Sequence, residues 1–143
     1  MHLESYILGK GFLSVVSGKS AGIKGERDLV RRFWENGWAA IRSPGSGSSR
    51  LPSPDIIAGT KNRKIVIEAK ITKEDRKYFD AEEIEQIRHF GEIFGAEPWL
   101  AIKFKGEDWL FVNLEDIENV GRTFLVSREI AKRKGLLLEE VIK

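Results

Sequence analysis

Two short runs, Pro54-Asp55-Ile56-Ile57-Ala58-Gly59 and Ile65-Val66-Ile67-Glu68-Ala69-Lys70, specify the centre of this protein. Both are rich in β-branched residues, and the segment between them, Thr60-Lys61-Asn62-Arg63, is polar, so the sequence predicts a β-hairpin. If Lys61-Asn62 forms a two-residue loop, the numbers of cross-strand partners sum to 123. Asp55 then lies opposite Glu68, on the same face of the hairpin.

The two faces of the second strand differ in chemistry. One face carries Val66, Glu68 and Lys70 beside Asp55, whereas Ile65, Ile67, Ala69 and Ile71 form an unbroken apolar face on the other side. Adjacent carboxylates repel unless a positive charge lies between them, and a hard cation such as Mg²⁺ or Mn²⁺ binds oxygen ligands. The lysine can orient a water molecule or neutralise a phosphate oxygen. This set is typical of phosphodiester hydrolysis. The alternative is an ordinary polar hairpin surface, because a one-residue slip would separate the groups.

The composition is that of one globular domain. The chain has 143 residues, of which 41% are hydrophobic and 32% charged. It has no cysteine, which excludes disulfides and thiolate zinc sites, and only two histidines, which excludes a histidine-rich metal site. Any metal chemistry must therefore depend on carboxylates.

Basic residues are concentrated around the hairpin. Residues 21–80 contain 13 basic and 8 acidic residues, whereas residues 81–143 contain 9 basic and 13 acidic residues. This asymmetry favours a polyanionic partner, nucleic acid first, near the predicted site. The alternative is an ordinary solvated surface.

Residues 1–20 are apolar but interrupted by Gly9, Lys10, Gly11 and Ser14. They are too short and too broken for a membrane span, and they lack the basic start of a signal peptide. We therefore expect a cytoplasmic protein with an N-terminal extension at 1–20, to which we assign no function, and a single domain at 21–143.

Residues 23–36 predict a helix that is ended by Gly37. Glu26 lies on the same stripe as the apolar residues Val30 and Phe33, where a carboxylate requires a partner or a metal ion. It is a candidate third oxygen ligand for the hairpin's metal. Alternatively, Glu26 lies at a solvated helix start, where the helix dipole favours it.

A strand is expected at 38–42, followed by a loop at 43–53 that is rich in Gly, Ser and Pro. A loop of this length in a small domain favours a functional segment that closes on a phosphate through its hydroxyl groups and Arg50. The alternative is a flexible surface loop.

The second half predicts further elements of one sheet. Asp80 has the character of a helix N-cap, Gly95 ends that helix, and the expected buried stripe contains Ile84, Ile87, Phe90, Gly91 and Phe94. Strands are expected at 99–104 and 109–112, a last short strand at 123–126 and a last helix at 136–142. Four Trp and eight Phe residues favour an intersubunit surface, unless they simply fill a large core.

These motifs carry a resemblance to a known family. Pro54-Asp55 followed by Glu68-Ala69-Lys70 is similar to the PD-(D/E)-x-K signature of metal-dependent nucleases. Together with Gly25-Glu26-Arg27 and the loop Arg42-Ser43-Pro44-Gly45-Ser46-Gly47-Ser48, the chain over residues 22–143 closely resembles archaeal Holliday junction resolvases. One departure is that Lys24-Gly25 directly precedes the glutamate, whereas family members carry a Lys-Gly pair a few residues earlier.

The resemblance implies an α/β fold, a single restriction-endonuclease-like domain with a central mixed β-sheet flanked by helices. It also implies a homodimer that resolves four-way DNA junctions by paired symmetric nicks during recombination and repair. The implied roles are a Mg²⁺ or Mn²⁺ site at Glu26, Asp55, Glu68 and the Ala69 carbonyl, a water-orienting Lys70 and a loop serine, Ser46. Our candidates for contacts with the DNA backbone are Lys24, Arg27, Arg42, Arg50 and Lys73.

Two other functions are compatible with the sequence. One is a repair or restriction endonuclease of the same fold with another DNA substrate. The other is a DNA-binding module that keeps the sheet without the chemistry. Cleavage of a four-way junction compared with linear duplex separates the first alternative, and the loss of cleavage with retained binding in Glu68→Ala excludes the second.

Overall fold

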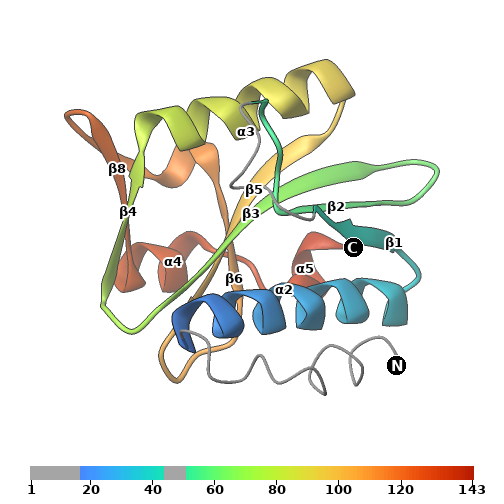
Figure 1. The fold of residues 1–143 in the computed structure, drawn as a ribbon, viewed down its shortest axis with the longest axis horizontal. Helices are drawn as coiled ribbons and strands as arrows, with labels where there is room; N and C mark the ends of the chain where they lie inside the picture. Colours follow the sequence, from blue (N-terminus) through green and yellow to red (C-terminus); the bar gives the residue numbers. More distant parts are fainter. Residues whose placement is uncertain (1–16, 44–50) are drawn as a thin grey trace.

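The computed structural model describes residues 17–43 and 51–143 (Figure 1). The predictions for residues 1–16 and 44–50, which include those for Ser46 and Arg50, lie outside the described residues. Among the helices of the described part, none has the length and apolar character that a membrane crossing requires.

The centre of the fold is a mixed five-stranded sheet, as predicted. Its strand order is β1-β2-β3-β5-β6, and only the β3/β5 pair is parallel. A parallel pair needs a crossover connection, which here contains helix α3. The five strands are β1 (Ala39–Arg42), β2 (Ile56–Gly59), β3 (Lys64–Thr72), β5 (Glu97–Phe104) and β6 (Leu110–Asn113).

The predicted hairpin is confirmed together with its register. Ile56 pairs with Ile67 and Gly59 with Lys64, so partner numbers sum to 123. The Thr60 N–H donates to the Arg63 carbonyl at 2.7 Å, which closes the two-residue loop. The alternation of side chains therefore places each hairpin residue on its expected face.

Two long helices cover opposite faces of this sheet (Figure 1). Helix α2 (Ser17–Glu35) begins six residues before the predicted start and ends ahead of Gly37, whose φ is +82°. Helix α3 (Ala81–Phe94) matches its prediction, with Asp80 in a capping box and Gly95 in the left-handed conformation. Its predicted buried stripe is wrong at Phe94, which is 40% exposed and contacts the Phe90 ring and the Lys64 ammonium.

Strand β3 contributes to two hydrophobic cores. Ile65, Ile67 and Ala69 pack beneath α2 and the C-terminal helix α5 (Leu138–Val141), whereas Val66 packs beneath α3. The predicted apolar face continues to Ile71, which faces Gly25 of α2 and is 39% exposed near the end of the strand. On the α3 face, the core at Val66 therefore gives way to the polar residues Glu68 and Lys70.

A second, three-stranded sheet was not predicted. Its order is β4-β8-β7, from β4 (Arg76–Asp80), β7 (Glu118–Val120) and β8 (Thr123–Ser127). The strand expected at 123–126 exists, but it belongs to this sheet. Helix α4 (Arg128–Lys134) and a 3₁₀ turn (Leu114–Asp116) were also missed. The sequence pattern of β4 predicts a strand only weakly, because only Phe79 of its five residues is buried.

Candidate active site

A polar hollow of about 260 Å³ lies between the hairpin and the first turns of α3. Its walls come from the segment before β2, from the α3 face of β3 and from α3 itself. The residues that line it include Pro54, Asp55, Glu68, Lys70, Glu83 and Gln86. The structure therefore brings the predicted Asp55, Glu68 and Lys70 together around one hollow.

Backbone hydrogen bonds to β3 fix Asp55. Its N–H donates at 2.9 Å to the carbonyl of Ile67, the residue that pairs with Ile56. Its Oδ2 accepts the Ala69 N–H at 2.9 Å. Burial raises the pKa of Asp55, although the Ala69 hydrogen bond and the charges of Lys70 and Arg42 lower it.

Glu68 is the most strongly perturbed carboxyl group of the site. Its side chain is only 17% exposed. Burial, followed by repulsion from Asp55, raises the pKa of Glu68 to about 8, and the charge of Lys70 only partly opposes this. The ionised form of Glu68 is therefore disfavoured in the folded protein, and a further positive charge nearby would favour it.

Lys70 lies between two carboxylates. Its Nζ is 3.7 Å from Glu68 Oε2 and 3.4 Å from Glu83 Oε2. Burial acts to lower the pKa of Lys70, but the carboxylates of Glu68, Glu83 and Asp55 outweigh it and raise that pKa. The side chain therefore stays an ammonium group at neutral pH.

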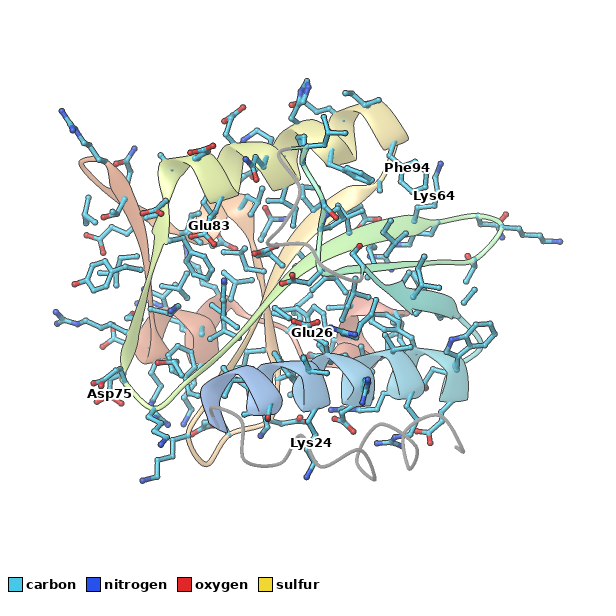
Figure 2. The ribbon with its side chains drawn as sticks, viewed as in Figure 1. Lys24, Glu26, Lys64, Asp75, Glu83 and Phe94 are labelled. Atoms are coloured by element: carbon cyan, nitrogen blue, oxygen red, sulfur yellow. The ribbon has the colours of Figure 1, made fainter. Side chains whose placement is uncertain are left out.

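Glu26 approaches from the opposite side of the sheet, on the side of α2 that faces the strands (Figure 2). Its Oε1 accepts a hydrogen bond from Arg42 Nε at 2.8 Å. Burial raises the pKa of Glu26 and the Arg42 hydrogen bond lowers it, while the charge of Asp55 raises it further. Glu26 is thus electrostatically linked to the hollow but is not among the residues that line it.

Gly25 permits this approach of α2. A Cβ atom at position 25 would lie 2.7 Å from Ile71 Cδ1 and 2.9 Å from Trp109 Cζ2. Real Cβ contacts are longer than this, so any side chain here would force the Ile71 side chain, the Trp109 ring or the helix itself to move. The Gly25-Glu26 pair therefore sets the helix close enough to the sheet for its carboxylate to meet Arg42.

The donor chemistry fits a hard divalent cation. Asp55 and Glu68 supply buried oxygens, and both have raised pKa values that a bound cation would lower again. Within residues 17–43 and 51–143, no group of three or more Asp, Glu or His side chains is arranged to hold a metal ion. Glu26 and Glu68 each have a cationic partner, Arg42 and Lys70. The four-ligand set of Glu26, Asp55, Glu68 and the Ala69 carbonyl therefore stays a prediction.

The other candidate residues are scattered. Lys24 and Lys73 are exposed and Arg27 is half-buried, whereas Arg42 is engaged with Glu26. Glu83 is the site residue that sequence reasoning missed, because its capping-box position explained it without any second role. Its spacing of three residues from Asp80 and its place after the hairpin gave no sign of a contact with Lys70.

The fold and this hollow define a class: a restriction-endonuclease-like nuclease domain with carboxylates and a lysine at the hairpin. A family model for the archaeal Holliday junction resolvase (hjc) matches residues 17–143. A crossover junction endodeoxyribonuclease Hjc of Archaeoglobus fulgidus is 39% identical over 123 residues, which cover 86% of this chain and 90% of the relative. One of Methanocaldococcus jannaschii is 38% identical over 105 residues, covering 73% and 74%.

A solved structure of Archaeoglobus fulgidus Hjc, titled a Holliday junction resolvase from an archaeal hyperthermophile, superposes with a TM-score of 0.78. The match has 38% sequence identity and covers 83% of this chain and 96% of that one. The chain therefore belongs to the archaeal Holliday junction resolvase family. The predicted family and the predicted fold class are both confirmed.

Proposed function

We propose that this protein resolves four-way DNA junctions in the cytoplasm, as a metal-dependent endonuclease that makes paired symmetric nicks during recombination and repair. The observation that carries the proposal is that Asp55, Glu68 and Lys70 share one hollow in a chain of this family. Oxygen ligands beside an ammonium group are the parts that phosphodiester hydrolysis requires.

The residues divide into two roles. Asp55 and Glu68 hold Mg²⁺ or Mn²⁺, assisted by Glu26 and the Ala69 carbonyl. Such an ion supplies a lowered pKa for its bound water and neutralises charge that develops on the phosphate. Lys70, beside Glu68 on β3, orients the attacking water and the scissile phosphate. Ser46, in the Gly- and Ser-rich segment of the sequence before β2, contacts the phosphate.

Substrate binding depends on backbone contacts and on two subunits. Lys24, Arg27, Arg42, Arg50 and Lys73 contact DNA phosphates, and junction shape gives the selectivity. A two-fold homodimer presents two identical hollows to a substrate that needs two cuts. Exposed large apolar side chains, such as Trp34 at 59% and Ile93 at 75%, are consistent with a surface that is buried between subunits.

One experiment tests the activity. A four-way junction and a linear duplex of equal length are incubated with the protein and Mg²⁺, and the products are separated on denaturing gels. We expect paired nicks in the junction only, and Glu68→Ala should abolish them while junction binding persists. Equal cutting of the duplex would favour a repair or restriction endonuclease, and binding without cleavage in either metal would favour a DNA-binding module.

A further inference from the structure

The ammonium group of Lys70 is reached by carboxylates from two different elements. Glu68 lies on the same strand, with its Oε2 at 3.7 Å, and Glu83 lies on α3, with its Oε2 at 3.4 Å. A lysine side chain has a flexible four-carbon stem, so its charge keeps one position only where partners restrain it. The position of Lys70 in the hollow therefore depends on these two contacts.

Glu83 is itself held in place by the helix that carries it. It is the third residue of α3, where its Oε1 accepts the Asp80 N–H at 3.2 Å in a capping box. The neighbouring residues Ile84 and Ile87 anchor the same helix in the core. Figure 2 shows Glu83 beneath the first turns of α3. Since one oxygen is bound to the backbone, the other is presented to Lys70 in a defined direction.

The two carboxylates differ in their other duties. Glu68 is a proposed metal ligand, so its charge is shared with the cation whenever the site is loaded. Glu83 lines the hollow but has no place in the proposed ligand set, and its only ion pair in the described part of the chain is with Lys70. Glu83 is therefore the restraint on Lys70 that persists in the loaded enzyme.

We propose that Glu83 is a positioning residue that holds the Lys70 ammonium in place for the attacking water and the scissile phosphate. The inference rests on the proposed nuclease function. It adds α3 to the catalytic arrangement and explains why the first turn of this helix lies against the hollow.

Glu83→Gln tests the proposal because glutamine keeps the acceptor for the Asp80 N–H while it removes the charge that faces Lys70. We expect the single-turnover cleavage rate at saturating enzyme to fall about tenfold, as for residues that orient a catalytic group. Junction affinity and the half-saturating Mg²⁺ concentration should not change. The matched control is Glu82→Gln, an exposed acid of the same helical turn, which should cleave at the unmodified rate.

A double variant separates positioning from a structural role. In a Lys70→Gln background, with residual cleavage followed in Mn²⁺, Glu83→Gln should cause no further loss of rate. Equal losses in both backgrounds would overturn the proposal. A raised Mg²⁺ requirement in Glu83→Gln would also overturn it, because Glu83 would then be a metal ligand.

A measurement without cleavage keeps the inference independent of the activity. Nuclear magnetic resonance of lysine labelled at Cε should give a higher order parameter for Lys70 than for the exposed Lys73, and Glu83→Gln should lower it. If Lys70 is as mobile as Lys73 in the unmodified protein, the positioning role is wrong. If Lys70 is ordered through Glu83 but no junction is cut, the proposed nuclease function is wrong, whereas the restraint of Lys70 by Glu83 is confirmed.

Discussion

Two carboxylates beside β3 differ in electrostatic character: Glu97, the first residue of β5, lies next to the hairpin end of β3, whereas Glu68 lies on the part of β3 that lines the hollow, here called the site end. At the hairpin end, Arg63 donates two hydrogen bonds to Glu97, at 2.6 and 2.7 Å, and this lowers the pKa of Glu97. At the other end, the nearest cation to Glu68 is Lys70 at 3.7 Å, and burial with repulsion from Asp55 raises the pKa of Glu68 to about 8.

The difference lies in burial and in the number of acids for each cation. Glu97 is 45% exposed and has a bidentate guanidinium of its own, so its negative charge is stabilised by the fold. Glu68 shares one ammonium with Asp55 and Glu83 in a half-enclosed hollow. The hairpin end therefore contributes stability, whereas at the site end the pKa of Glu68 is raised, so that its ionised form needs a further cation.

The largest expected effect is a difference in cleavage rate between variants at the site end and at the hairpin end. Asp55→Asn should reduce the single-turnover rate of junction cleavage about a thousandfold, because a lost metal ligand removes several kcal/mol of transition-state stabilisation. Glu97→Gln, at the hairpin end, should leave that rate unchanged. Junction affinity without divalent metal should be the same for both variants. A comparable loss of cleavage rate in Glu97→Gln would show that the hairpin end is as important for catalysis as the site end.

The second prediction concerns stability against pH in the metal-free protein. The pKa of Glu68 is raised to about 8 in the folded state from an ordinary 4.5, so the unfolded chain loses this proton at lower pH. The free energy of unfolding should therefore fall as the pH rises from 4.5 to about 8. The fall should amount to a few kcal/mol, since each pH unit between the two pKa values corresponds to about 1.4 kcal/mol.

Glu68→Gln is the variant that checks this fall. Its stability should fall much less over the same range, and it should be more stable than the unmodified protein at pH 8, as measured by urea denaturation in a chelator. Added Mg²⁺ should stabilise the unmodified protein at pH 8 but not the variant. If the free energy of unfolding depended on pH identically in the two proteins, the pKa of Glu68 would not be raised in the folded state.

At the hairpin end, the register could be predicted from the sequence, but the ion pair between Arg63 and Glu97 could not. Alternation along 56–59 and 64–67 and the two-residue loop fix the register, so the pairing of Ile56 with Ile67 could be derived in advance. The repulsion between Asp55 and Glu68 follows from the same register, but the burial of Glu68 could not be derived, because it depends on α3, which comes later in the chain. The contact between Glu83 and Lys70 was hidden for the same reason.

The missed elements share another cause. Strand β4 is amphipathic only through Phe79, and its partner β8 lies more than forty residues further along the chain, so local pattern carried little information about the second sheet. The early start of α2 was missed because Gly22 weakens helix propensity just ahead of the predicted start. Gly25 lies inside the predicted helix, and its close approach to Ile71 and Trp109 explains the glycine there.

The third prediction tests how the site end is assembled. Gly25→Ala should destabilise the protein by about 1–3 kcal/mol, because the new Cβ would overlap Ile71 and Trp109. It should also slow cleavage, since a displaced α2 carries Glu26 away from Arg42. Gly22→Ala, on the same helix, is the control. Its Cβ meets nothing within 4 Å, so it should stabilise the helix by roughly 0.5–1 kcal/mol. Similar destabilisation by both variants would show that the close contacts of Gly25 with Ile71 and Trp109 are not the cause.

The smallest effect is expected at the hairpin end, with the opposite dependence on pH. The pKa of Glu97 is lowered by Arg63, so its contribution is present above the ordinary value of 4.5 and is lost as the pH falls through the folded-state pKa. Glu97→Gln should therefore be less stable than the unmodified protein at pH 7, by about 0.5–1 kcal/mol for a half-exposed pair, and the difference should vanish in acid.

Urea denaturation at several pH values measures this effect, and Glu92→Gln provides the control. Glu92 is exposed on α3 and has no ion pair in the part of the chain that the structure describes, so its loss should change little at any pH. Against this baseline, Glu97 and Glu68 should give stability profiles of opposite slope, although both are carboxylates with a basic partner beside one strand. If the contribution of Glu68 to the free energy of unfolding rose with pH, the ionised form of Glu68 would already be stabilised by the protein. The electrostatic reason for a cation at this site would then be lost.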